Sequence, residues 1–573
     1  MRVRWLFLCT VASLGLTACA GLSPGPGDSA ASVIEGDADN SSYGQFLAGQ
    51  AALNHADSAS AEGYFERAGR LDPDDQSLLD NRAFTSALLA GDIPQAAVLA
   101  PTGPDADVGL RHLGALVRAV DALADGKARL ARTILTGPDS GAPDEPAAAL
   151  LTPFAAAAAG DANGSIVHPV INGEPVAQFF ANLDQGKLFE RARRYDEAET
   201  AYRALIAKGD PGGIASLSLG QMLERRGRDA DAVAIYDSAI AARKDGDELT
   251  TARARAAAHG PPPPAASLRS TAAEALIAPA TALLAEKQEE IALAYLRLAL
   301  HLDPTRDEAW MLVGDVLDNN GDAAGARTAY AKVGPGAAEY LAARVKLAWN
   351  YQNAGDKETA LATARETLAR KPTDEDTQIT YADLLRADER YDESAKVLDG
   401  LIGARPEAAD WKLLYMRAVD YEESGRWSDA EQDLRIALKM RPDEAELLNF
   451  LGYSWIDRGV KLPEALAMVK RAVSLQPESG AMIDSLGWGY FRMGDYRDAV
   501  AQLEAAVVLE PGDPDVNDHL GDAYWRVGRK TEAGYQWRRV LTLDPSVKLK
   551  AEVEAKLASG LDHAPTAPVV AVR

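Results

Sequence analysis

The 573-residue sequence has few of the residues that usually carry chemistry: two cysteines, Cys9 and Cys19, and seven histidines. Both cysteines lie near the N-terminus, so no disulfide framework can form and the rest of the chain has no catalytic thiol. No histidine lies four residues from another, which removes the simplest metal-binding pair on a helix. No glycine-rich phosphate loop follows a strand. The sequence therefore predicts no enzyme, no metal site and no other cofactor.

Positive charge and long apolar runs are also scarce. Lys and Arg number 60 against 85 Asp and Glu, which gives a net charge of −25. A surface this acidic repels nucleic acid and gains nothing from anionic lipid surfaces. The apolar run at residues 5–16 is too short to span a membrane, which takes about 20 residues. A chain of this length would usually form several globular domains, but an array of repeats avoids that limit because each repeat contacts only its neighbours.

Residues 480–513 contain the clearest pattern, which predicts two amphipathic helices. Their inner faces combine small residues with large ones: Leu486, Gly487, Tyr490, Ala499, Leu503 and Ala506. A proline ends the second helix, and the pattern of ending prolines recurs every 34 residues at Pro477, Pro511 and Pro545. Any antiparallel helix bundle can show Ala and Leu at such spacings, but a shared 34-residue frame favours a repeat.

This unit resembles the tetratricopeptide repeat (TPR). The resemblance implies an all-α fold, a right-handed superhelical solenoid of antiparallel helix pairs. Two arrays are expected, because a proline-rich break at residues 259–266 interrupts the helical pattern. The N-terminal array would span residues 43–258 in degenerate form, and the C-terminal array residues 267–560, including a capping helix. An irregular insert at residues 137–184 would be either a spacer or a contact loop, and residues 561–573 a disordered tail.

The first residues are predicted to be a targeting segment rather than part of the fold. Arg2 and Arg4 precede the apolar run, and Leu-Thr-Ala-Cys follows at residues 16–19. This sequence resembles the lipobox of bacterial lipoproteins, which implies a signal peptide at residues 1–18, a lipidated Cys19 and a flexible tether at residues 19–42. Ordinary secretory cleavage is the alternative. Ala, not Asp, follows the cysteine, which by the family rule implies the outer membrane, facing the periplasm.

The family resemblance also implies which residues of each first helix line the inner surface. They are Tyr415, Glu422, Asn449, Tyr453, Asp457, Asp484, Trp488, Phe491, Arg492, Asp518, Asp522, Trp525 and Arg526. Aromatic residues among carboxylates suit an amphipathic helix or an extended peptide with basic residues. The alternative is that Trp488 and Trp525 only pack between neighbouring repeats.

Residues 448–453 and 484–488 are similar to the C-terminal repeats of outer-membrane TPR lipoproteins of Gram-negative bacteria. That group includes adaptors that bind a periplasmic C-terminal processing protease and cell-wall hydrolases, and the resemblance implies an envelope scaffold with protein partners. Two alternatives stay open: a structural component of an export or polysaccharide-secretion assembly, and a regulator of peptidoglycan synthesis. The sequence gives no oligomeric state.

Overall fold

The computed structural model describes most of the chain from residue 41 to residue 561. The described ranges are 41–54, 57–71, 76–102, 106–141, 145–169, 171, 175–242, 247–404 and 410–561. The predicted signal peptide, the lipidated Cys19, nearly all of the predicted tether and the predicted tail from residue 562 lie outside them.

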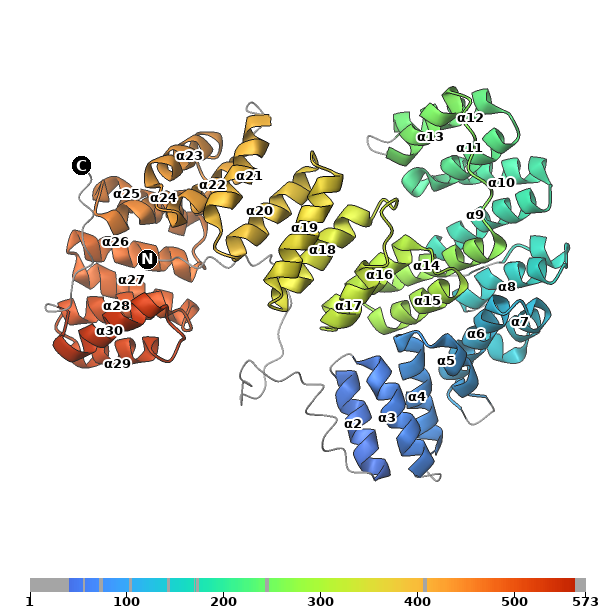
Figure 1. Ribbon diagram of the computed structural model, residues 1–573, viewed down its shortest axis with the longest axis horizontal. Coiled ribbons are helices and arrows are strands. Elements are labelled where there is room, and N and C mark those ends of the chain that lie inside the picture. Colours follow the sequence, from blue (N-terminus) through green and yellow to red (C-terminus); the bar gives the residue numbers. More distant parts are fainter. Residues whose placement is uncertain are drawn as a thin grey trace. The chain divides into compact units, whose positions relative to one another are not determined.

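Helices account for all regular structure in the described ranges (Figure 1). The first half contains α2 (Ser42–Asn54), α3 (Ser58–Leu71), α4 (Gln76–Ala90), α5 (Ile93–Leu99), α6 (Val108–Ala124), α7 (Ala128–Leu135), η1 (Pro138–Ser140), α8 (Pro146–Ala158), η2 (Gly164–Ile166), α9 (Pro175–Arg191), α10 (Tyr195–Lys208), η3 (Pro211–Gly213), α11 (Ile214–Arg225), α12 (Asp229–Ala242), α13 (Asp247–Ala257), α14 (Leu268–Ala285), α15 (Glu289–Leu302), α16 (Asp307–Asn319) and α17 (Ala323–Tyr330). The second half contains α18 (Tyr340–Asn353), α19 (Lys357–Arg370), α20 (Glu375–Ala387), α21 (Tyr391–Ala404), α22 (Trp411–Glu423), α23 (Trp427–Met440), α24 (Ala445–Arg458), α25 (Leu462–Leu475), α26 (Gly480–Met493), α27 (Tyr496–Leu509), α28 (Pro514–Arg526), α29 (Lys530–Val540) and α30 (Val547–Ser559).

The helices pair because a glycine of the first helix receives a large side chain of the second. A Cβ added at Gly487 would lie 2.6 Å from Leu503 Cγ, and one added at Gly521 would lie 2.5 Å from Trp537 Nε1. The same close approach, with the same spacing of 16 residues, joins Gly49 to Phe65, Gly186 to Tyr202, Gly220 to Tyr236 and Gly314 to Tyr330. The all-α repeat fold predicted from the sequence is therefore confirmed.

The described residues form two compact units, residues 41–363 and residues 364–561, which divide within α19. We call them the N-terminal unit and the C-terminal unit. This division corrects the predicted boundary at residues 259–266. Residues 260–267 are indeed non-helical, but α14 and α15, which follow them, pack against α4, α6, α8 and α9. Helices on both sides of the proline-rich segment thus share one hydrophobic core.

The predicted irregular insert at residues 137–184 is also corrected. It contains η1, α8, η2 and the first half of α9, which begins with a proline in the favoured first position of a helix. Leu151 and Phe154 of α8 are buried, and α8 contacts α7, α9 and α14. The described part of this segment therefore contributes to the core of the N-terminal unit.

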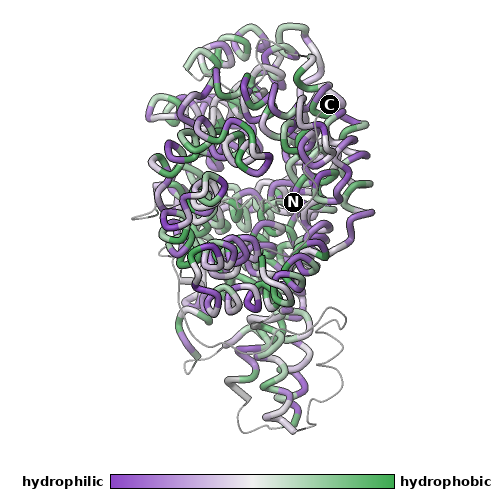
Figure 2. The backbone as a smooth tube through the Cα atoms, turned by 90° about the vertical axis from the view of Figure 1, so that its left-hand side faces the viewer, coloured by the Kyte–Doolittle hydropathy of each residue, from purple (hydrophilic) through white to green (hydrophobic). Residues whose placement is uncertain are grey.

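Hydrophilic and hydrophobic residues are interspersed along the chain (Figure 2). Across the described ranges, no helix is both long enough and apolar enough to cross a membrane.

Candidate protein-binding surface

The surface of interest lies on the C-terminal unit, where the first helices of three repeats, α24, α26 and α28, contact one another in succession. We call the side chains that they place there the inner wall: Asn449, Tyr453, Asp457, Asp484, Trp488, Phe491, Arg492, Asp515, Asp518, His519 and Asp522. Nine of these eleven were expected to line the inner surface, and all of them belong to the three contacting helices.

Aromatic rings form a stack at the centre of the inner wall. Trp488 lies parallel to His519, with ring centroids 4.1 Å apart and an interplanar angle of 13°. Its other stacking partner is Phe491, at 4.7 Å and 8°. Trp488 is only 8% exposed, whereas Phe491 is half-buried. Trp488 therefore packs between neighbouring repeats, as the alternative interpretation expects. The accessible edge of the stack belongs to Phe491.

A buried ion pair lies beside this stack. His519 is 1% exposed, and its Nδ1 lies 2.9 Å from a carboxylate oxygen of Asp484. Burial alone would lower the pKa of His519, but the negative charges of Asp484, Asp515 and Asp518 outweigh it and raise the pKa to about 9. His519 is therefore a fixed cation that connects α26 to α28.

Asp518 and Asp522 were predicted to face a partner and are instead bound within the unit. The Nζ atom of Lys556, on α30, lies 2.7 Å from Asp518 and 2.8 Å from Asp522. Trp537 Nε1 also donates to Asp522 over 3.0 Å. All four side chains are buried. The reason is that α30 supplies the cation for these carboxylates, so that their charge is already compensated within the unit.

Other predicted residues divide between buried and accessible positions. Tyr415 and Asn449 are buried, so neither is presented on an open groove. Glu422 is half-buried and accepts from Arg458 over 2.7 Å, and Arg492 donates to the main-chain oxygen of Asp457 over 2.7 Å. The predicted residues that are half-buried or exposed, and so remain accessible, are Glu422, Tyr453, Asp457, Phe491, Arg492, Trp525 and Arg526.

Sequence reasoning missed the two internal cations, His519 and Lys556. The signal was the spacing of opposite charges by about one repeat. Asp484 and His519 are 35 residues apart, Arg386 and Asp420 are 34 apart, and Glu422 and Arg458 are 36 apart. Charged residues separated by about one repeat lie on neighbouring first helices, where they can pair.

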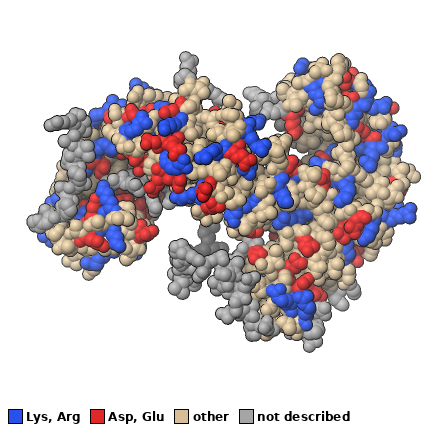
Figure 3. Space-filling model, in the orientation of Figure 1, with Lys and Arg blue, Asp and Glu red and all other residues tan. Residues whose placement is uncertain are grey.

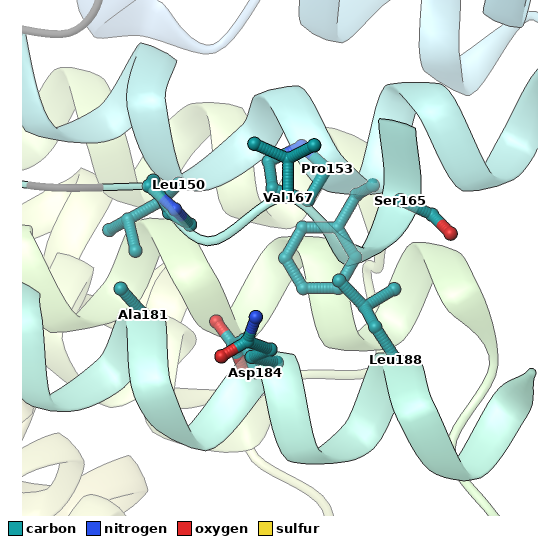
Figure 4. Close-up of a pocket in the computed structure, with 10 residues that line it drawn as sticks. Leu150, Pro153, Ser165, Val167, Ala181, Asp184 and Leu188 are labelled. Carbon is teal, nitrogen blue, oxygen red and sulfur yellow. The ribbon is translucent and has the colours of Figure 1, made fainter. Parts of the chain in front are cut away.

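A second cluster of interest is a small cavity in the N-terminal unit, lined by Leu150, Pro153, Phe154, Ser165, Val167, Pro169, Ala181, Asp184, Gln185 and Leu188 (Figure 4). Its volume of about 10 Å³ holds at most a single water molecule. Asp184 is buried, neither of its carboxylate oxygens has a hydrogen-bond partner among the described residues, and burial raises its pKa to about 7. The cavity is thus too small for a substrate or cofactor.

Charge on the face in Figure 3 is mixed, with Asp and Glu gathered around α22. Among the residues that the structure describes, no three His, Cys, Asp or Glu side chains come together in a way that could hold a metal ion.

Comparison with protein families finds the tetratricopeptide repeat. Its family model matches residues 183–247, 345–409, 415–480 and 485–547. These segments include α10 to α12, α20, α21 and the inner-wall helices. The four segments are therefore tetratricopeptide repeats, and no catalytic family is among the matches.

The chain is similar to a curated protein and to two solved structures. The TPR repeat-containing protein PA4667 of Pseudomonas aeruginosa is 30% identical over 195 residues, which cover 34% of this chain and 32% of that protein. The chain thus matches about a third of that relative's length. A tetratricopeptide repeat protein from Parabacteroides merdae is 16% identical, with a TM-score of 0.38 over 43% of this chain and 96% of its own. The APC/C hetero-tetramer Cut9–Hcn1 is 15% identical, with a TM-score of 0.37 over 84% of this chain and 96% of its own.

Proposed function

We propose that this tetratricopeptide-repeat chain is a non-catalytic scaffold that binds protein partners through the inner wall. The observation that carries the proposal is the composition of its accessible part. Tyr453 and Phe491 present half-buried aromatic surface beside Asp457 and Arg492. Aromatic anchors surrounded by charged groups are typical of protein-binding surfaces.

The setting that we propose is the bacterial cell envelope, with the chain anchored to the outer membrane through a lipidated Cys19 and facing the periplasm. The support is the sequence of residues 16–19 together with the basic and apolar residues before it. Among envelope scaffolds we favour an adaptor for a periplasmic C-terminal processing protease and its cell-wall hydrolase substrates. A structural role in export or polysaccharide secretion, or regulation of peptidoglycan synthesis, would use the same kind of surface.

Cross-linking followed by affinity purification from solubilised envelopes tests the scaffold. Phe491→Ala removes the accessible edge of the aromatic stack and should weaken partner recovery by about tenfold or more. Met493→Ala is the matched control, because Met493 lies at the end of the same helix and is 41% exposed. If both variants recover the same proteins as the unaltered chain, the inner wall is not the binding surface.

A separate experiment tests the anchor. Cys19→Ser should move the protein from the outer-membrane fraction to a soluble or unprocessed form, because it removes the thiol that carries the lipid. A variant that still sediments with outer membranes would exclude lipidation at this residue, without bearing on the inner wall.

A further inference from the structure

Ion pairs between neighbouring first helices, and one between α28 and α30, hold several carboxylates of the C-terminal unit. The closest contacts are Arg386 with Asp420 at 2.8 Å, Glu422 with Arg458 at 2.7 Å, Asp484 with His519 at 2.9 Å and Asp518 with Lys556 at 2.7 Å. In each pair, the cation and the carboxylate come from different helices. A carboxylate of the inner wall therefore normally has an internal cation.

Asp515 is the exception among the described residues of the inner wall. It is half-buried in the first turn of α28, and its carboxylate has no hydrogen bond or ion pair with any residue that the structure describes. The pKa of Asp515 is raised to about 6, mainly by burial; the cation of His519 acts against this shift, and the carboxylates of Asp513, Asp484 and Asp518 add to it. The surface around Asp515 thus has an excess of negative charge.

Two buried hydrogen-bond donors beside Asp515 are also unsatisfied. Within the described ranges, His519 Nε2 and Trp488 Nε1 have no hydrogen-bond partner, although their side chains are only 1% and 8% exposed. An unpaired buried donor typically costs about 1–3 kcal/mol. His519 lies one helical turn after Asp515, and its ring stacks on Trp488. A ligand that brings an acceptor as well as a positive charge would satisfy both features.

We propose that the inner wall at α26 and α28 binds a peptide segment of a protein partner through a lysine or arginine side chain paired with Asp515. The main-chain carbonyl oxygens of the segment would accept from Trp488 Nε1 or His519 Nε2, and its apolar side chains would cover Phe491. The proposal rests on the proposed scaffold function and adds the chemistry of the partner. Charge complementarity favours a cationic peptide, because an acidic peptide or a nucleic acid would meet the unpaired carboxylate.

A phage-displayed library of random nine-residue peptides, panned on the purified protein, tests this chemistry without a known partner. The variants are Asp515→Asn and the control Asp498→Asn, which removes the same charge from an exposed position on α27. We expect lysine- and arginine-containing peptides to be enriched by the unaltered protein and by Asp498→Asn. Binding of the most enriched peptide, measured by fluorescence anisotropy, should be at least tenfold weaker for Asp515→Asn and for the peptide with its basic residue changed to Gln.

The outcomes separate this site from the scaffold function. Enrichment of neutral or acidic peptides, or equal affinity for Asp515→Asn, overturns the cation site, while loss of partner recovery in Phe491→Ala would still support the scaffold. If the peptides are enriched only through a contact between two copies of the chain, which sedimentation would show as a dimer, the cation site is overturned as well. Thermal unfolding guards against a folding defect: Asp515→Asn should keep or raise the midpoint, since it removes an uncompensated carboxylate.

Discussion

The two units use the same kind of helix pair but build different cores. In the N-terminal unit, α14 contacts α8 and α9, and α15 contacts α4 and α6, so helices far apart in the sequence share one core. In the C-terminal unit, the helices contact their near neighbours, and the core is divided into several smaller clusters. In the first unit, α14 and α15 pack against helices from much earlier in the chain and complete a shared core. In the second unit, simple stacking leaves a row of first helices that forms a wall.

The two units also place their buried charges differently. In the N-terminal unit, Lys187 bonds to Glu274 over 2.7 Å and lies 3.4 Å from Asp184, so the charges are held between two packed helices, α9 and α14. In the C-terminal unit, ion pairs run from one first helix to the next. Stability of the helices that share the large core of the first unit should therefore respond together, and that of the second unit repeat by repeat.

The largest expected effect is loss of the shared core. Phe154→Ala empties a position on α8 that is 1% exposed, which typically costs about 3–5 kcal/mol. Because the core joins distant helices, native-state hydrogen exchange should show lost protection at α4, α6, α14 and α15 together. Residues 410–561 should keep their protection. Loss confined to α7, α8 and α9 would mean that the N-terminal unit is a simple stack as well.

A comparable effect is expected at the end of the C-terminal unit. Lys556→Met leaves Asp518 and Asp522 buried without a cation, and breaking a buried pair in this way costs about 3–5 kcal/mol. The loss of exchange protection should be confined to α26 through α30. Lys548→Met is the control, since its pair with Glu552 is exposed and 3.9 Å long, and it should change stability by less than about 1 kcal/mol. Equal effects of the two variants would show that the ion pairs of Lys556 do not contribute to the stability of the fold.

The repeat fold could be predicted from sequence because its signals are local. The 34-residue frame requires a small residue where two helices meet, and Gly487 and Gly521 meet large side chains at that place. At residues 137–184 the repeat frame fails, and because helix α8 in this segment is apolar on all sides, its place in the shared core could not be predicted from an amphipathic period. An amphipathic period appears only where one face meets water, and most of α8 is buried.

Whether a charged residue of the inner wall faces a partner or pairs within the unit could not be predicted from the sequence of a single helix. Asp518 and Asp522 look identical in sequence whether they face a partner or Lys556. Their assignment depends on α30, which lies beyond the last repeat and follows no repeat pattern. Asp515, by contrast, has Lys550 35 residues after it, yet among the described residues the structure pairs its carboxylate with no cation.

An effect of intermediate size on stability is expected at the buried charges of the N-terminal unit, and it should depend on pH. Burial raises the pKa of Asp184 from 3.8 to about 7, so the folded state holds a proton that the unfolded state releases between these values. Stability should then fall as pH rises through this window. Asp184→Asn keeps the neutral shape and should match the unaltered protein near pH 4, yet be roughly 2–4 kcal/mol more stable at pH 8. Urea unfolding at both pH values measures this.

The control for this pH dependence is Asp196→Asn on α10. Asp196 is exposed, so the variant should follow the unaltered protein at every pH within about 0.5 kcal/mol. An Asp184→Asn variant that is less stable at pH 8 would show that the carboxylate stabilises the fold through Lys187, and that the charged network is favourable as a whole.

The smallest effect tests what the two units share, the glycine that admits a large side chain. Gly521→Ala would put a Cβ 2.5 Å from Trp537 Nε1, and that ring cannot withdraw, because it is 1% exposed and bonded to Asp522. Overpacking costs about 1–3 kcal/mol, which exceeds the gain of about 1 kcal/mol that alanine brings to a helix. Gly400→Ala lies within α21 with nothing within 4 Å, so it should instead stabilise by about 0.5–1 kcal/mol. Urea midpoints that move in opposite directions would confirm close packing as the reason for the frame. If both variants stabilise, Trp537 has room to move, and the spacing of 16 residues between glycine and large side chain has another cause.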